Sequence, residues 1–149
     1  MYCHAADQET GLLYPTNIVS VHRDDDYGVA IPFRGPESQP FIIAQAMRSK
    51  QIAKANLPTN HRDSYPDNLR RRIRASLKCV IAAPIMDYDP DEIVDYHPNS
   101  QEAIPLGTIS LDCDSANLDQ LGMVNPEGDV LDEINDILKS CARVVYLIL

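Results

Sequence analysis

The chain has 149 residues, a net charge of −9 at pH 7, 44% hydrophobic residues and no tryptophan. This length suits one hydrophobic core, so we expect a single domain over residues 1–149. The acidic balance argues against binding to nucleic acid or to an anionic membrane surface, because both would repel the protein.

Charge and cysteines are unevenly placed along the chain. Residues 1–84 contain 11 Lys and Arg against 8 Asp and Glu, whereas residues 85–149 contain 2 against 14. The four cysteines are widely spaced and include no C-x-x-C pair, which argues against a zinc ribbon. We find no signal peptide and no apolar run near the ~18 residues of a membrane span. We therefore expect a cytoplasmic protein with free thiols.

The N-terminal half alternates between extended and turn-forming segments. MYCHAAD has the character of a strand, and the turn QETG leads to a second, β-branched segment that we expect Pro15 to interrupt. VAIPF predicts a short extended piece. Residues 40–51 form the first helical pattern, since their apolar side chains recur at helical spacing. Residues 52–57 then predict a short strand.

The C-terminal half contains the longest apolar patterns. Residues 69–76, LRRRIRAS, predict a basic helix or turn, and the apolar run at 77–86 is typical of a buried strand. The acidic connection 87–103 shows no helical pattern, so the next apolar strand at 104–112 should pair antiparallel with the first. An apolar stripe over 129–149 predicts a long C-terminal helix. This order of elements is typical of the α+β class.

Three of these segments together resemble a known family. RIRASLKCVIAAPI, PLGTISLDCDS and the C-terminal CARVVYLIL resemble the second half of a GAF domain. In that family a strand ends in a proline-containing apolar motif, a glycine-containing strand ends in an acid, and an amphipathic helix closes the fold. The resemblance implies a central antiparallel sheet of about five or six strands. Helices would cover one face, and loops on the other would enclose a pocket. The helix that usually precedes the first strand has no counterpart in this sequence.

The resemblance also implies a function. GAF domains bind cyclic nucleotides, tetrapyrroles, amino acids or small organic signals, so the fold alone selects no ligand or cofactor. We expect a sensory or regulatory domain that binds a small molecule. It would signal through its last helix to a homodimer partner or an output module. Two alternatives stay open: a thiol-dependent reductase like the GAF-type free methionine sulfoxide reductase, and a dimerisation scaffold without a ligand. The sequence contains no catalytic motif such as G-x-S-x-G or a P-loop, so we assign no catalytic residue.

The basic segment offers the best candidates for ligand binding. Arg70, Arg72 and Arg74 precede the first buried strand, where guanidinium groups would hold an anionic ligand. His61 and Tyr65, in the preceding loop, are placed to line the same pocket mouth. The alternative is that these side chains face solvent and that the arginines balance the acidic half.

Thiols and carboxylates meet at the end of the second buried strand. Cys79 and Cys113 lie on strands that we expect to pair, so they are either reductase thiols or small buried hydrophobes; Cys79 is a candidate pocket residue. Strand alternation sends Asp112 and Asp114 to one face and Cys113 to the other. We therefore expect no metal site here, and we expect a carboxylate to accept hydrogen bonds from backbone amides in the following turn.

Two further motifs match known sites only locally. The Cys3–His4 pair is of the kind to which phytochrome GAF domains attach a bilin, but it lies on the first strand rather than deep in the domain. Asp87, Asp89 and Asp91 alternate as in a calcium loop, yet the glycine and glutamate that an EF-hand requires are missing. We assign neither a chromophore nor a metal.

Overall fold

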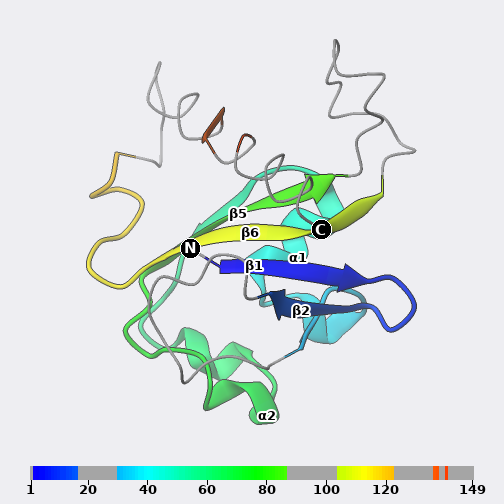
Figure 1. Cartoon of the computed structure of the whole chain (residues 1–149). Helices are drawn as coiled ribbons and strands as arrows, with labels where there is room; N and C mark the ends of the chain where they lie inside the picture. Colours follow the sequence, from blue (N-terminus) through cyan, green and yellow to red (C-terminus); the bar gives the residue numbers. More distant parts are fainter. Residues whose placement is uncertain (1, 17–29, 87–103, 123–135, 138–139, 141–149) are drawn as a thin grey trace.

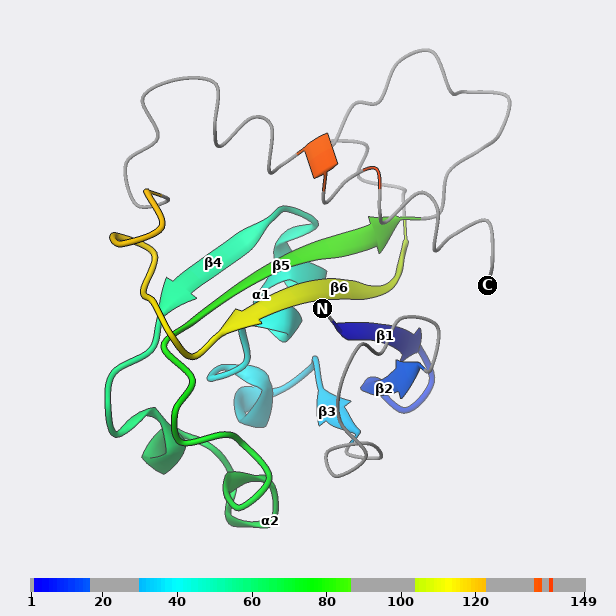
Figure 2. The same cartoon turned by 60° about the vertical axis from the view of Figure 1, so that its left-hand side comes forward.

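The computed structural model describes residues 2–16, 30–86, 104–122, 136–137 and 140. These residues form an α+β fold on a six-stranded antiparallel sheet, with strand order β3-β2-β1-β6-β5-β4 (Figures 1 and 2). The predicted class and the predicted antiparallel sheet are confirmed. The strands are β1 (Tyr2–Asp7), β2 (Leu12–Thr16), β3 (Ile31–Pro32), β4 (Ala53–Asn56), β5 (Cys79–Met86) and β6 (Pro105–Cys113). The helices are α1 (Ile42–Ser49) and α2 (Asp67–Arg70), with 3-10 turns η2 (Pro36–Ser38) and η3 (His61–Ser64).

Strand β2 continues through Pro15, where we expected an interruption. Pro15 pairs with His4 of β1, whereas β3 reaches only Leu12 and Leu13 of β2. Within the described ranges, β2 is therefore an edge strand at Pro15 on the side away from β1. A proline is tolerated there because its missing N–H removes no ladder bond on that side.

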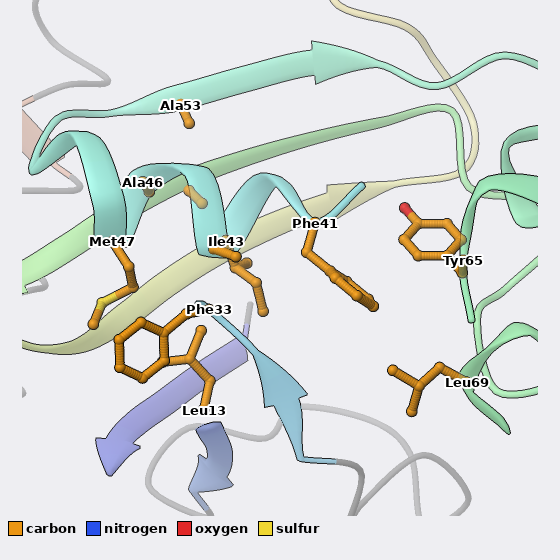
Figure 3. Close-up of a cluster of buried hydrophobic side chains, with 11 residues drawn as sticks. Leu13, Phe33, Phe41, Ile43, Ala46, Met47, Ala53, Tyr65 and Leu69 are labelled. Atoms are coloured by element: carbon orange, nitrogen blue, oxygen red, sulfur yellow. The ribbon is translucent and has the colours of Figure 1, made fainter. Parts of the chain in front are cut away.

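Helix α1 covers one face of the sheet, and we call this side the α1 face. It contacts β4, β5 and β6 (Figure 2). Its buried residues are Ile43, Ala44, Ala46 and Met47, which confirms the predicted helix and its apolar side. They belong to a cluster that includes Leu13 and Phe33 from the β2–β3 side of the sheet (Figure 3). This packing holds α1 against the sheet, since burying a large side chain such as Ile43 or Met47 contributes about 1.5–3 kcal/mol.

The opposite side of the sheet carries a second apolar cluster. We call it the thiol face, because Cys3, Cys79 and Cys113 lie in or against this cluster. Every residue of β5 is buried. This strand therefore buries both faces, which explains why its sequence is one continuous apolar run.

Strands β1 and β6 approach closely at Gly107. This residue is opposite Ala5 of β1 and Ile85 of β5. A Cβ atom at position 107 would overlap the carbonyl oxygen of His4. The pairing of β1 with β6 therefore requires a glycine here.

We predict that G107A lowers the free energy of unfolding by about 3 kcal/mol, because β1 must move to admit the methyl group. Urea unfolding measures the loss. G122A is the control: Gly122 has a φ of 71°, but nothing lies within 4 Å of an added Cβ. It should lose only about 1 kcal/mol from left-handed strain. Equal losses in the two variants would contradict the close-approach explanation.

Two predicted segments lie largely or wholly outside the described residues. Of the C-terminal helix expected over 129–149, only Asp136, Ile137 and Ser140 are described, and all three are helical and exposed. The long helix stays a prediction. The acidic connection 87–103, with its alternating aspartates, is not described at all. None of the described helices has the length and apolar character that a transmembrane span requires.

Candidate functional site

A cavity of about 150 Å³ lies on the α1 face, between the start of α1, the chain around α2, and strands β1, β5 and β6. Its apolar lining residues are Pro15, Ile31, Phe41, Ile42, Ile43, Leu69, Ile73, Leu77 and Val80. In another protein, an apolar cavity of about this volume holds a benzene ring. The cavity therefore suits a ligand built on a single ring or a short branched chain.

Two aromatic rings form part of the wall. Phe41 immediately precedes α1, and Tyr65 follows η3; their ring centroids are 4.8 Å apart at an interplanar angle of 49°. Figure 3 shows both rings beside Leu69 of α2. Burial, and after it the charge of Asp112, raises the pKa of Tyr65, so its hydroxyl stays protonated. Tyr65 thus adds one polar atom to a mainly apolar wall.

The floor of the cavity is polar and comes from the two central strands. His4 and Tyr2 from β1 lie in it beside Ser110 and Asp112 from β6. Thr108, Ser110 and Asp112 occupy every second position of β6, so they share the α1 face. The Ser110 hydroxyl donates to Asp112 Oδ1 at 3.5 Å.

His4 is the unusual residue of this floor. Its side chain is buried, and Nδ1 has no hydrogen-bond partner. Burial lowers its pKa from 6.5 to about 4, so the imidazole is neutral at neutral pH. Thr108 directly opposes His4 in the ladder, and its Oγ1 also lacks a partner. A buried polar atom without a partner costs about 1–3 kcal/mol, so a molecule that bonds Nδ1 would recover this energy.

Arg74 joins the two carboxylates at the end of β6. Its Nη2 lies 3.2 Å from Asp112 Oδ2, and its Nη1 lies 3.0 Å from Asp114 Oδ2. We expected one of these carboxylates to bind backbone amides; instead both bind the guanidinium group, which reaches them from the chain before β5. Burial raises the pKa of Asp112, although Arg74 opposes this shift. The guanidinium group of Arg74 is therefore already paired with two carboxylates of the protein, and the side chain lines the cavity.

The structure separates the six candidate residues into two groups. Tyr65, Arg72 and Arg74 line the cavity, whereas Arg70, His61 and Cys79 do not. Arg72 is exposed at the rim, and none of the ion pairs among the described residues involves it. It is the arginine that is free of a carboxylate partner in the described part of the site.

The other candidates have structural positions. Arg70 pairs with Asp67 at 3.1 Å. His61 is buried, with Nδ1 2.9 Å from the Pro58 carbonyl oxygen and Nε2 3.1 Å from that of Arg74. These contacts tie the chain before α2 to the chain after it. We expected His61 to line the pocket mouth. Instead, its ring is buried outside the cavity lining and links the backbone before α2 to the backbone after it.

The cavity lies on the face that carries α1, not on the face opposite the helices as the resemblance implied. The reason is local packing. Ala44 and Ala46 of α1, together with Ala82 of β5, are small residues in the same cluster, which lets the helix approach the sheet. Where α1 begins, the larger Phe41 and Ile42 and the polar floor leave space between helix and sheet.

Cys79 faces away from this cavity. It lies directly opposite Cys113 in the ladder between β5 and β6, on the thiol face. Alternation had predicted that Cys113 would point away from Asp112 and Asp114, and this is confirmed. Cys3, Cys79 and Cys113 are free thiols. A reductase centred on Cys79 would therefore not use the described cavity as its substrate site.

Sequence reasoning missed His4, Ser110 and Asp112 as cavity residues. His4 was weighed only as half of a Cys-His pair, and Asp112 only as the polar end of a strand. A usable signal was present in β6, where polar residues occupy alternate positions 108, 110 and 112 between apolar residues. Such a pattern indicates a polar site on one face.

Comparisons with family models, with curated proteins and with solved structures gave no match to this chain. Within residues 2–16, 30–86, 104–122, 136–137 and 140, no group of three or more His, Cys, Asp or Glu side chains is arranged to hold a metal ion. The function must therefore be argued from the cavity and its polar floor.

We predict that His4 makes the stability depend on pH. The folded protein holds His4 at a pKa of about 4, against 6.5 in the unfolded chain, so stability falls as the pH drops from about 6.5 towards 4. Between pH 7 and pH 5 this amounts to about 2 kcal/mol. The H4N variant should lose that part of the pH dependence. Urea unfolding of both proteins at both pH values measures it.

Asp112 acts in the opposite direction. The pKa of Asp112 is higher in the folded protein than in the unfolded chain, so protonated Asp112 stabilises the fold. This contribution is lost as the pH rises from the ordinary pKa of Asp to the raised one. The comparison of wild type with H4N cancels this contribution in the first approximation. An identical pH dependence in the two proteins would show that His4 is not held in its neutral form.

Proposed function

We propose that this protein is a sensory or regulatory domain of the GAF kind that binds a small molecule in the cavity on the α1 face. The observation that carries the proposal is the buried, neutral His4, which lines the floor of an apolar cavity and whose Nδ1 has no hydrogen-bond partner. Ligand sites combine apolar walls with a few convergent polar groups in this way. The six-stranded antiparallel sheet supports the proposal, since the resemblance implied a sheet of this kind, although with the pocket on its other face.

The lining residues favour a particular ligand class. The volume suits a single ring, and the walls favour an apolar body. The charge of Arg74 is matched by Asp112 and Asp114, which leaves Arg72 to attract an anionic group at the rim. His4 would exchange a hydrogen bond with a hydroxyl or amide on the floor. We therefore expect a small aromatic or branched molecule with a polar group at one end and a carboxylate at the other.

Binding would be transmitted through the last helix. A ligand that bonds His4 and Arg72 contacts β1 and the chain after α2 together, and so favours one arrangement of the cavity walls. In the proposed mechanism this arrangement biases the C-terminal helix, which acts on a homodimer partner or an output module. The protein would work in the cytoplasm.

We predict that 4-hydroxybenzoate, used as a probe, raises the Tm more than benzoate or phenol does. We expect its hydroxyl to face the polar floor and its carboxylate to face Arg72, and each of the other two probes lacks one of these groups. Tyramine, whose amine would face Arg72, should give no shift. Calorimetric titration of each probe gives the affinity, and a thermal shift follows from it by mass action.

Matched arginine variants test the rim contact. R72A should weaken the binding of 4-hydroxybenzoate about tenfold and leave phenol binding unchanged, because a charge-assisted hydrogen bond is lost. Arg71 is also exposed but does not line the cavity, so R71A should bind like wild type. If no probe at millimolar concentration shifts the Tm of wild type, the ligand-free scaffold becomes the better explanation.

We also predict that the full chain forms a dimer through the C-terminal segment. L138E places a charge in the expected apolar stripe and should give a monomer in sedimentation experiments at tens of micromolar. K139E changes a neighbouring position off the stripe and should leave the dimer intact. A wild-type monomer at high concentration would contradict signalling through a homodimer.

The second candidate function, a thiol-dependent reductase, is supported by the direct opposition of Cys79 and Cys113. Because both thiols lie on the thiol face, its substrate would need a second site there. A variant in which both cysteines are replaced by serine separates the two candidates. If the cavity is the functional site, this variant should bind 4-hydroxybenzoate like wild type. If the protein is a reductase, the variant should lose all reductase activity.

A further inference from the structure

Cys79 and Cys113 are placed to form a cross-strand disulfide. They are directly opposed in the antiparallel pair of β5 and β6, and both side chains belong to the thiol face. Opposed residues in such a pair have Cα atoms about 4.5–5.5 Å apart, which lies within the range that a disulfide spans. The bond could form without a change of register.

The two thiols have different surroundings. Cys113 is partly exposed, and its sulfur lies 3.4 Å from Ser115 Oγ and accepts the backbone N–H of Ala116 at 3.4 Å. These hydrogen bonds, Ser115 first, lower the pKa of the Cys113 thiol. Cys79 is buried, and its thiol donates to the Ala116 carbonyl oxygen at 3.5 Å. Burial, with the neighbouring Cys113, raises the pKa of Cys79.

This asymmetry is that of an attacking and a resolving cysteine. Thiols that react with oxidants are accessible, have thiolate character, and often lie next to a second cysteine that resolves the first product. Cys113 is accessible and has thiolate character, and Cys79 is the neighbouring cysteine that can resolve its oxidised form. Cys3 lies on the same face but opposes Ile109, so it has no thiol partner across its ladder with β6.

We propose that Cys113 and Cys79 form a hydroperoxide-reactive site in which Cys113 is oxidised and Cys79 resolves it into a disulfide. The site lies on the thiol face and does not depend on the proposed cavity ligand. A hydroperoxide is the oxidant class that fits, because it is small enough to reach a partly exposed thiol at a strand end.

The chemistry balances in two steps. The Cys113 thiolate attacks one peroxide oxygen, so that an S–O bond forms, the O–O bond breaks, and the leaving alkoxide takes a proton to become an alcohol. The sulfur is oxidised by two electrons to a sulfenic acid, and the peroxide is reduced. Cys79 then gives up its proton and attacks the Cys113 sulfur, forming the S–S bond and breaking the S–O bond, and water leaves. In total, two thiols and one hydroperoxide give a disulfide, an alcohol and water.

The experiment uses a C3S/C141S variant of the full chain, in which only the pair remains. After treatment with hydrogen peroxide, the intact mass should fall by two hydrogen atoms, and peptide mapping should find Cys79 linked to Cys113. Dithiothreitol should reverse both changes. A Cys113 that passes directly to sulfinic acid, with no link to Cys79, would overturn the proposal.

Single variants test the assigned roles. With Cys79 replaced, the sulfenic acid on Cys113 has no resolving partner, so C79S should give about tenfold more dimedone adduct at Cys113 than wild type gives. C79A serves if C79S does not fold. C113S should leave Cys79 reduced, and the control C3S should behave like wild type. Oxidation of Cys79 in C113S at the wild-type rate would reverse the roles and reject the assignment.

Discussion

The pairing of β1 with β6 is the contact on which the rest of the structure depends. In the described residues it joins the strands that come first and last along the chain, which are neighbours in the middle of the sheet. It also sets His4 beside the polar residues of β6. Gly107 permits this pairing, since a side chain there would meet the His4 backbone. The cavity floor is shared between these strands, so it cannot exist until two distant segments of the chain have met. A site made from such long-range pairing depends on the whole sheet rather than on any one loop.

The electrostatics of the floor favour neutral groups. Burial lowers the pKa of His4 and raises that of Asp112, so both shifts disfavour a charge beneath the cavity. Asp112 nevertheless accepts a hydrogen bond from Nη2 of Arg74, while Nη1 of the same side chain donates to Asp114. The floor is therefore suited to recognition by hydrogen bonds, and the exposed Arg72 supplies charge at the rim. This division explains why a polar floor can coexist with walls of isoleucine, leucine and phenylalanine.

Local patterns predicted much of the fold and little of the site. The apolar runs of β5 and β6 and the helical spacing of α1 are properties of short segments, and the structure confirms them. Alternation also placed Cys113 and Asp112 on opposite faces correctly. The roles of His4 and His61 were misjudged because their surroundings come from elsewhere in the chain. His4 lies beside strand β6, and His61 contacts the backbone of Pro58 and Arg74. Two arginines of the basic segment, Arg72 and Arg74, line the cavity, but no sequence pattern shows that Arg74 is bound by two carboxylates.

Strand β6 carries different chemistry on its two sides, with Ser110 and Asp112 towards the cavity and Cys113 towards the thiol face. Strand geometry alone keeps these sets apart, since neighbouring side chains point in opposite directions. Insertion or deletion of one residue within β6 would exchange the faces of every residue beyond it. Carboxylates would enter an apolar cluster and a thiol would replace the polar floor. A change in the length of this strand would therefore disturb the cavity floor and the thiol face together, whereas a substitution at one position changes the chemistry of one face only.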